Sequence, residues 1–202
     1  MADMHRFQTR VRHGLIDVWW LYDDGGLTLL IPYLLTQQKS YLEGAKLRVF
    51  TLSGKKRQLD REQHNMAALL NKFRISYAQV NVLPDPAHKR PSAKTMARFN
   101  HLIEPFVVKG HSGGSGREAE GPLITEAELK AHEEKTWKHL RLAEMLKRYS
   151  ANADLIVVTL PVPRRGLVNA SLYLGWLDMM SRDLPPTLMI RGNQQSVLTF
   201  YS

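Results

Sequence analysis

The side chains best suited to chemistry are two adjacent carboxylates, Asp23 and Asp24, which are followed directly by Gly25 and Gly26. Carboxylate oxygens could bind magnesium, or could act as a general acid and a general base. Adjacent carboxylates in a turn more often cap a helix and face solvent, and glycines there permit a tight reversal of the chain. Of these two readings, we favour capping over catalysis for this turn.

A second candidate site lies in the segment 161–166, which contains Arg164, Arg165 and Gly166. Two guanidinium groups at this position could hold an anion. A phosphate-binding loop needs backbone N–H donors, however, and prolines stand at two positions of this segment. We therefore treat both turns as candidate binding sites and assign no catalytic residue.

Motifs for other chemistries are missing from the sequence. The eight histidines do not show His-Glu-x-x-His or a comparable metal-ligand spacing. The single Gly-x-Ser-x-Gly string, at 110–114, is not preceded by the strand that a nucleophile elbow requires. The absence of cysteine excludes thiol catalysis and disulfides. The glycines at 113–116 resemble a flexible linker, because no strand precedes them and no Gly-Lys-Ser/Thr follows. We expect no enzyme activity, no metal and no cofactor.

Hydrophobic patterns predict strands that alternate with helices. Continuous or alternating apolar runs indicate strands at residues 16–22, 46–52, 77–83, 154–160 and 187–191. Such alternation predicts an α/β fold with a mainly parallel, doubly wound sheet in the order 3-2-1-4-5. A last strand at 197–201 is predicted to pair antiparallel at the edge, because the short connection to it permits only a hairpin.

Two helix starts carry capping signals. Asp60 with Gln63, and Thr125 with Glu128, have the spacing of a capping box. The helix that begins after Thr125 is predicted to run without a break to about Tyr149.

The chain length fits a single domain, which we place at residues 15–202. We predict a flexible arm at 1–14 and a flexible loop at about 107–123. In a sheet of this kind, ligands bind where the winding direction switches, which here brings 23–26 opposite 161–166.

The net charge is +9, from 28 basic and 19 acidic residues. The basic residues are dispersed and form no helix-turn-helix, zinc-finger or aromatic-interleaved motif, so we expect no nucleic-acid partner. Anionic lipid at a cytosolic membrane surface is a better match, with simple solvated surface charge as the alternative. No apolar run is long enough to span a bilayer and the start lacks a signal-peptide pattern, so we expect this chain to be soluble by itself.

Several strings closely resemble the cytosolic carboxyl-terminal region of the cation-chloride cotransporters, namely residues 16–35, 46–50, 69–74 and 103–106. The end of the chain, residues 188–202, resembles the sodium-coupled branch. The potassium-chloride branch has a more glycine-rich segment where this chain has Arg191-Gly-Asn-Gln194. The resemblance covers about residues 15–106 and 124–202, whereas family members carry a longer, charged insert in place of 107–123.

This resemblance implies a universal-stress-protein-like lobe, the second half of the cytosolic C-terminal domain of a sodium-(potassium)-chloride cotransporter. That domain would lie on the cytoplasmic side of the plasma membrane and serve regulation and dimerisation, without transport or catalysis by itself. Its partners would be a second copy, the transmembrane domain and the first cytosolic lobe. The alternative is a nucleotide-binding sensor that uses 23–26 and 164–166. We interpret these residues as a vestigial site, in which Asp23 or Asp24 could pair with Arg164 or Arg165.

Overall fold

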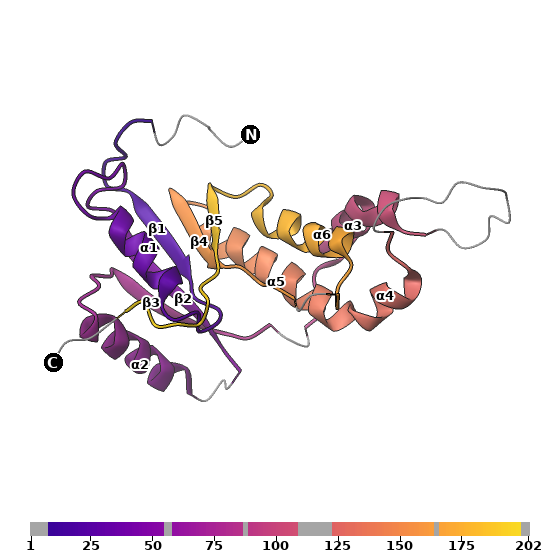
Figure 1. Cartoon of the computed structure of the whole chain (residues 1–202), viewed down its shortest axis with the longest axis horizontal. Coiled ribbons are helices and arrows are strands. Elements are labelled where there is room, and N and C mark those ends of the chain that lie inside the picture. Colours follow the sequence, from indigo (N-terminus) through magenta and orange to yellow (C-terminus); the bar gives the residue numbers. More distant parts are fainter. Residues whose placement is uncertain (1–7, 55–57, 87–88, 109–122, 164–165, 199–202) are drawn as a thin grey trace, which may run out of the picture. The chain divides into compact units, whose positions relative to one another are not determined.

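The computed structural model describes residues 8–54, 58–86, 89–108, 123–163 and 166–198 (Figure 1). The chain divides into two compact units. The first comprises Met1–Asp85, Ser150–Val162 and Asp183–Ser202, and the second comprises Pro86–Tyr149 and Pro163–Arg182.

The first unit contains a five-stranded sheet in the order β3-β2-β1-β4-β5, in which every pair of neighbours is parallel. This confirms the predicted α/β class and sheet order. The strands are β1 (Leu15–Trp19), β2 (Lys46–Ser53), β3 (Gln79–Pro84), β4 (Leu155–Thr159) and β5 (Thr187–Ile190). Every residue of β4 is buried, as the continuous apolar run predicts for a central parallel strand.

Two helices of the first unit, α1 (Leu27–Leu35) and α2 (Leu59–Lys72), pack against one face of this sheet (Figure 1). Alternate strand residues point to this face, and they form one hydrophobic cluster with helix residues spaced three or four apart. Its members include Ile16, Val18, Leu47, Val49, Val80, Val157, Leu29, Met66 and Leu70.

The start of α2 differs from the prediction. The N-cap is Gln58, and Asp60 is the second helical residue instead of the cap. A carboxylate in the first turn still interacts favourably with the positive end of the helix dipole.

The residues that point away from α1 and α2 include polar and aromatic side chains. Asp17 is fully buried, and its carboxylate accepts two hydrogen bonds from Arg48, at 2.8 Å from Nε and 2.6 Å from Nη2. This hydrogen bonding raises the pKa of Arg48. The ring of Trp19 stacks on Phe50 with centroids 4.7 Å apart, and its Nε1 donates to Ser150 Oγ at 2.9 Å.

The second unit is helical in the described residues. Its elements are α3 (Ala93–Ile103), the 3-10 helix η2 (Glu104–Phe106), α4 (Glu126–Ala131), α5 (Glu133–Ser150, whose last residue belongs to the first unit) and α6 (Ala170–Ser181). The capping box before α4 is confirmed, because Thr125 N–H donates to Glu128 Oε2 at 2.8 Å and Glu128 N–H donates to Thr125 Oγ1 at 3.2 Å.

The prediction of one unbroken helix from Thr125 to Tyr149 is wrong. His132 has φ −109° and ψ 15°, outside the helical region, and separates α4 from α5. The ring of His132 meets Trp176 of α6 edge-on, with centroids 6.4 Å apart. Two helical turns later, His139 stacks flat on the same indole at 4.5 Å, and its burial there lowers the pKa of His139. A tertiary contact of this kind leaves no mark in the helical periodicity of α5.

The end of the chain also differs from the prediction. β5 pairs parallel with β4 as predicted, but residues 191–198 are in no strand, so the described residues do not form the predicted hairpin with a strand at 197–201. The rest of the predicted edge strand, residues 199–201, lies outside the described residues.

Two further predictions involve segments that are described only in part. Val11 N–H donates to Tyr41 O at 2.8 Å and its side chain packs on the core, while residues 1–7 lie outside the described residues. Val107 and Ile124 form a parallel bridge, and 109–122 between them also lie outside. The predicted arm, loop and single domain stay predictions.

Candidate functional site

The switch point of the sheet lies at β1, because β1 pairs with β2 on one side and with β4 on the other. The turn Asp23–Gly26 follows β1 and leads into α1, so it lies at the carboxyl end of the central strand. This is the edge at which open α/β sheets bind ligands.

Asp24 is committed to the first turn of α1. Its side chain is buried, and Oδ2 accepts hydrogen bonds from Thr28 N–H at 3.1 Å and from Thr28 Oγ1 at 2.6 Å. Oδ1 accepts a further bond from Gly26 N–H at 3.2 Å. These bonds satisfy a backbone donor that the start of a helix leaves open, so Asp24 serves as a cap from two residues before the N-cap position, which is held by Gly26.

Asp23 is exposed and has a local role. Its Oδ1 accepts a hydrogen bond from Gly25 N–H at 3.0 Å, which is the geometry of an Asx turn. Together, the two carboxylates therefore engage the N–H groups of both glycines, which are the donors that a phosphate would need at this turn.

The chain's own C-terminal residues cover the turn. We call residues 192–198 the closing segment. Val197 N–H donates to Gly25 O at 2.9 Å, which ties the segment to the turn. A Cβ added to Gly25 would lie 1.9 Å from Gln195 O, and one added to Gly192 would lie 2.0 Å from Asp24 O. The two backbones therefore approach so closely that only glycine fits at either position.

Leu198 anchors the far end of the closing segment. Its side chain packs against the hydrophobic cluster of the first unit, and a Cβ on Gly26 would lie 2.6 Å from Leu198 Cδ1. Two internal hydrogen bonds shape the segment, from Gln195 N–H to Asn193 Oδ1 at 3.1 Å and from Ser196 Oγ to Leu198 O at 3.0 Å. A ligand that sought the two glycines would have to displace this segment.

Of the other predicted site residues, one belongs to the second unit and two lie outside the described residues. Gly166 belongs to the second unit, is exposed and has φ +75°, and a Cβ there would meet nothing within 4 Å. Arg164 and Arg165 lie outside the described residues, so the proposed pairing with Asp23 or Asp24 stays a prediction. What the sequence reasoning missed is the closing segment. Its signal in the sequence is Gly192, which lies in the short connection of the predicted hairpin.

Other kinds of site find little support in the part of the chain that the structure describes. No three histidine, aspartate or glutamate side chains among these residues are grouped as a metal site would require. None of the described helices has both the length and the apolar character needed to cross a lipid bilayer.

Comparison with known proteins gives a consistent result. The family model for solute carrier family 12 matches residues 1–202. Solute carrier family 12 member 2 from Squalus acanthias is 46% identical over 98% of the chain, and member 2 from Homo sapiens is 45% identical over 98%. The bumetanide-sensitive sodium-(potassium)-chloride cotransporter of Manduca sexta is 44% identical over 100% of the chain.

The chain spans only a small part of these relatives, 17%, 16% and 18% of their respective lengths. The match nevertheless extends over the entire chain, including the turn and the closing segment. The chain therefore belongs to solute carrier family 12, the cation-chloride cotransporters, and specifically to the sodium-coupled branch that its motifs resemble.

Proposed function

We propose that the chain is a cytosolic regulatory and dimerisation region of an electroneutral sodium-(potassium)-chloride cotransporter. Family membership supports the assignment to such a transporter, and the coverage of the relatives leaves more than four fifths of their length to supply the ion pathway. In this proposal the chain neither transports ions nor catalyses a reaction by itself.

The observation that carries the proposal is the closing segment. A nucleotide sensor of the universal-stress type would use the switch point, with residues 23–26 on one side and 164–166 on the other. Here Val197 and Leu198 occupy that edge, and the N–H groups of Gly25 and Gly26 are bonded to Asp23 and Asp24. This arrangement favours a structural lobe over a nucleotide sensor.

The proposed partners follow from the same assignment. A second copy would form the homodimer, and the transmembrane domain and first cytosolic lobe of the same transporter would receive the regulatory signal. The net charge of +9 suits a position near anionic lipid on the cytoplasmic side of the plasma membrane.

The proposal can be tested in the full-length transporter with two alanine variants. Gly25→Ala disturbs the contact with the closing segment, whereas Gly44→Ala has the same backbone conformation without any neighbour within 4 Å. At matched surface abundance, we expect Gly25→Ala to change sodium-dependent chloride uptake several-fold more than Gly44→Ala does. Equal uptake by the two variants and the unmodified transporter would contradict a regulatory role.

A further inference from the structure

Strand β3 lies at one edge of the sheet, where among the described strands it pairs with β2 alone (Figure 1). An edge strand presents backbone N–H and C=O groups on its outer side, and these can pair with a further strand.

The register shows which groups of β3 point outward. Ser53 of β2 lies opposite Pro84, and Ser53 O accepts a hydrogen bond from Asp85 N–H at 2.7 Å. In a parallel ladder, every second residue directs both of its backbone groups to the same neighbour. Every second residue before Asp85 therefore directs its backbone N–H and C=O toward β2. The backbone N–H and C=O of the residues between them, Val80 and Val82, point to the outer side of the sheet.

The next two positions in this alternation, Ala78 before Val80 and Pro84 after Val82, cannot donate a hydrogen bond to an outer strand. Pro84 has no N–H, and Ala78 N–H already donates to Leu47 O at 2.7 Å. On the outer edge of β3, Val80 and Val82 are therefore the two residues that offer both an N–H and a C=O, and they are centred on Asn81.

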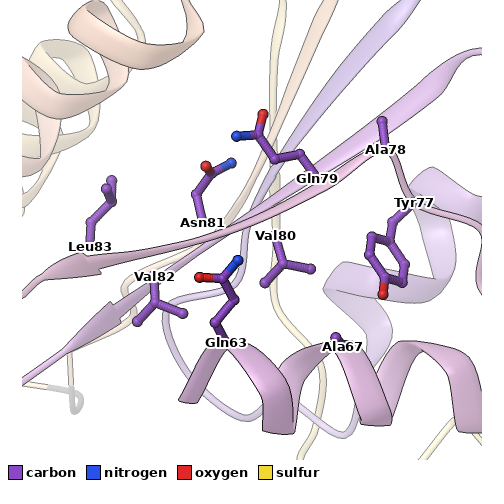
Figure 2. A pocket seen from close by; sticks show the side chains of 9 residues that line it. All are labelled: Gln63, Ala67, Tyr77, Ala78, Gln79, Val80, Asn81, Val82 and Leu83. Atoms are coloured by element: carbon purple, nitrogen blue, oxygen red, sulfur yellow. The ribbon is translucent and has the colours of Figure 1, made fainter. Parts of the chain in front are cut away.

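A groove of about 430 Å³ runs along this edge. Figure 2 shows its lining, with Val80 and Val82 directed toward α2, Gln79 and Asn81 directed to the other side, and Gln63 rising from α2 toward the strand. Ala67 adds only a small side chain, so α2 leaves the edge open.

The groove is uncharged in a strongly basic chain. Residues 77–83 carry no ionisable group except the tyrosine at 77, while the chain as a whole carries +9. Like charge opposes the approach of two copies over most of such a surface. Native edge strands are commonly protected by charged side chains, and β3 lacks them between its two ends. A neutral edge is where a second copy can approach with least repulsion.

We infer that a second copy of this chain pairs with β3 in an antiparallel manner, about a two-fold axis through Asn81, and joins the two sheets. This inference rests on the proposed dimerisation role and gives it a surface. In this register Val80 faces Val82 of the other copy, and each pair exchanges both N–H···O bonds. Moving the axis by one residue leaves a C=O of Val80 or Val82 facing Pro84 or Ala78, which have no free N–H.

The two-fold axis makes a sharp prediction for cross-linking, because the chain has no cysteine of its own. Asn81 of one copy would lie opposite Asn81 of the other copy in a non-hydrogen-bonded pair, with their Cα atoms about 4.5 Å apart. This Cα–Cα distance lies within the range of a disulfide. Two Gln79 residues would lie four positions apart along the strands, more than about 13 Å. Gln79 is also more exposed than Asn81, so disulfides that form by random collision of two chains should form faster in the Gln79→Cys control.

The experiment oxidises Asn81→Cys and Gln79→Cys chains separately under the same conditions. We expect the Asn81→Cys chain to form the inter-chain disulfide at least about tenfold faster, because only that pair meets the distance limit. A mixture of Gln79→Cys and Leu83→Cys chains should also cross-link, since these positions face each other in the same register. This second pair keeps the test valid if Asn81→Cys does not fold.

Sedimentation of the unmodified chain over a concentration series separates the two levels of the proposal. Self-association with fast cross-linking at Asn81 supports the β3 interface. The β3 interface is overturned, and dimerisation is retained, if the chain self-associates but Asn81→Cys and Gln79→Cys form inter-chain disulfides at equal rates. In that case the mixture of Gln79→Cys and Leu83→Cys chains should also form no cross-link. A strict monomer at high micromolar concentration overturns the β3 interface, while the regulatory role is judged by the uptake assay.

Discussion

Replacing Gly25 by alanine tests how closely the closing segment rests on the turn. Gly25 has φ +77° and Gly44 has φ +74°, so alanine at either position pays the same left-handed backbone cost of roughly 1–2 kcal/mol. Each substitution regains about 0.4–1 kcal/mol by restricting the unfolded chain. Only at Gly25 does the new Cβ meet a backbone atom, Gln195 O at 1.9 Å. Overpacking against groups that cannot rotate away typically costs about 1–3 kcal/mol.

We therefore expect Gly25→Ala to lower the free energy of unfolding by about 1–3 kcal/mol more than Gly44→Ala. Urea denaturation followed by tryptophan fluorescence measures this difference, provided that the two variants share one m-value. Hydrogen exchange at Val197 gives a local measurement, because its N–H donates to Gly25 O in the unmodified chain. Equal stability of the two variants, together with unchanged protection of Val197, would refute the close packing of the closing segment.

Three further predictions concern buried polar groups. Arg48→Met should destabilise the first unit by about 3–5 kcal/mol, because it strands the buried carboxylate of Asp17, and urea denaturation should show much of this loss recovered in an Asp17→Leu, Arg48→Met double variant. Ser150→Ala should cost about 1–3 kcal/mol by thermal or urea unfolding, since Trp19 Nε1 loses its acceptor, whereas Ser150→Thr should cost less. Burial lowers the pKa of His139 in the folded chain, so below about pH 6.5 the unfolded chain binds more protons than the folded chain does. The free energy of unfolding should therefore decrease as the pH falls from about 7 to about 5. Denaturation of a His139→Gln variant over the same pH range should show a smaller decrease.

Much of the sheet could be predicted because its signals are local. The apolar run of β4 and the turn residues Asp23–Gly26 mark elements whose type depends on neighbouring residues in the chain. The capping box of Thr125 and Glu128 is equally local, and its two reciprocal hydrogen bonds are present. The strand order then follows from the handedness of crossovers and the single switch in winding direction.

The closing segment could not be predicted because its partner is distant in sequence. A stretch of Gly, Asn, Gln and Ser after a strand has the composition of a hairpin turn. Its actual path depends on Gly25 and Gly26, which provide room for a second backbone about 170 residues away. The break at His132 has the same origin, since the ring packs on Trp176 from another helix. In both cases a tertiary contact overrides a local preference.

Calorimetric titration of the whole chain with ATP tests most directly whether the closing segment fills the ligand edge of this family member. With Gly25 and Gly26 covered, we expect no heat of binding up to millimolar ATP. Saturable binding in the low micromolar range would contradict the assignment of this edge as closed and would favour a nucleotide sensor.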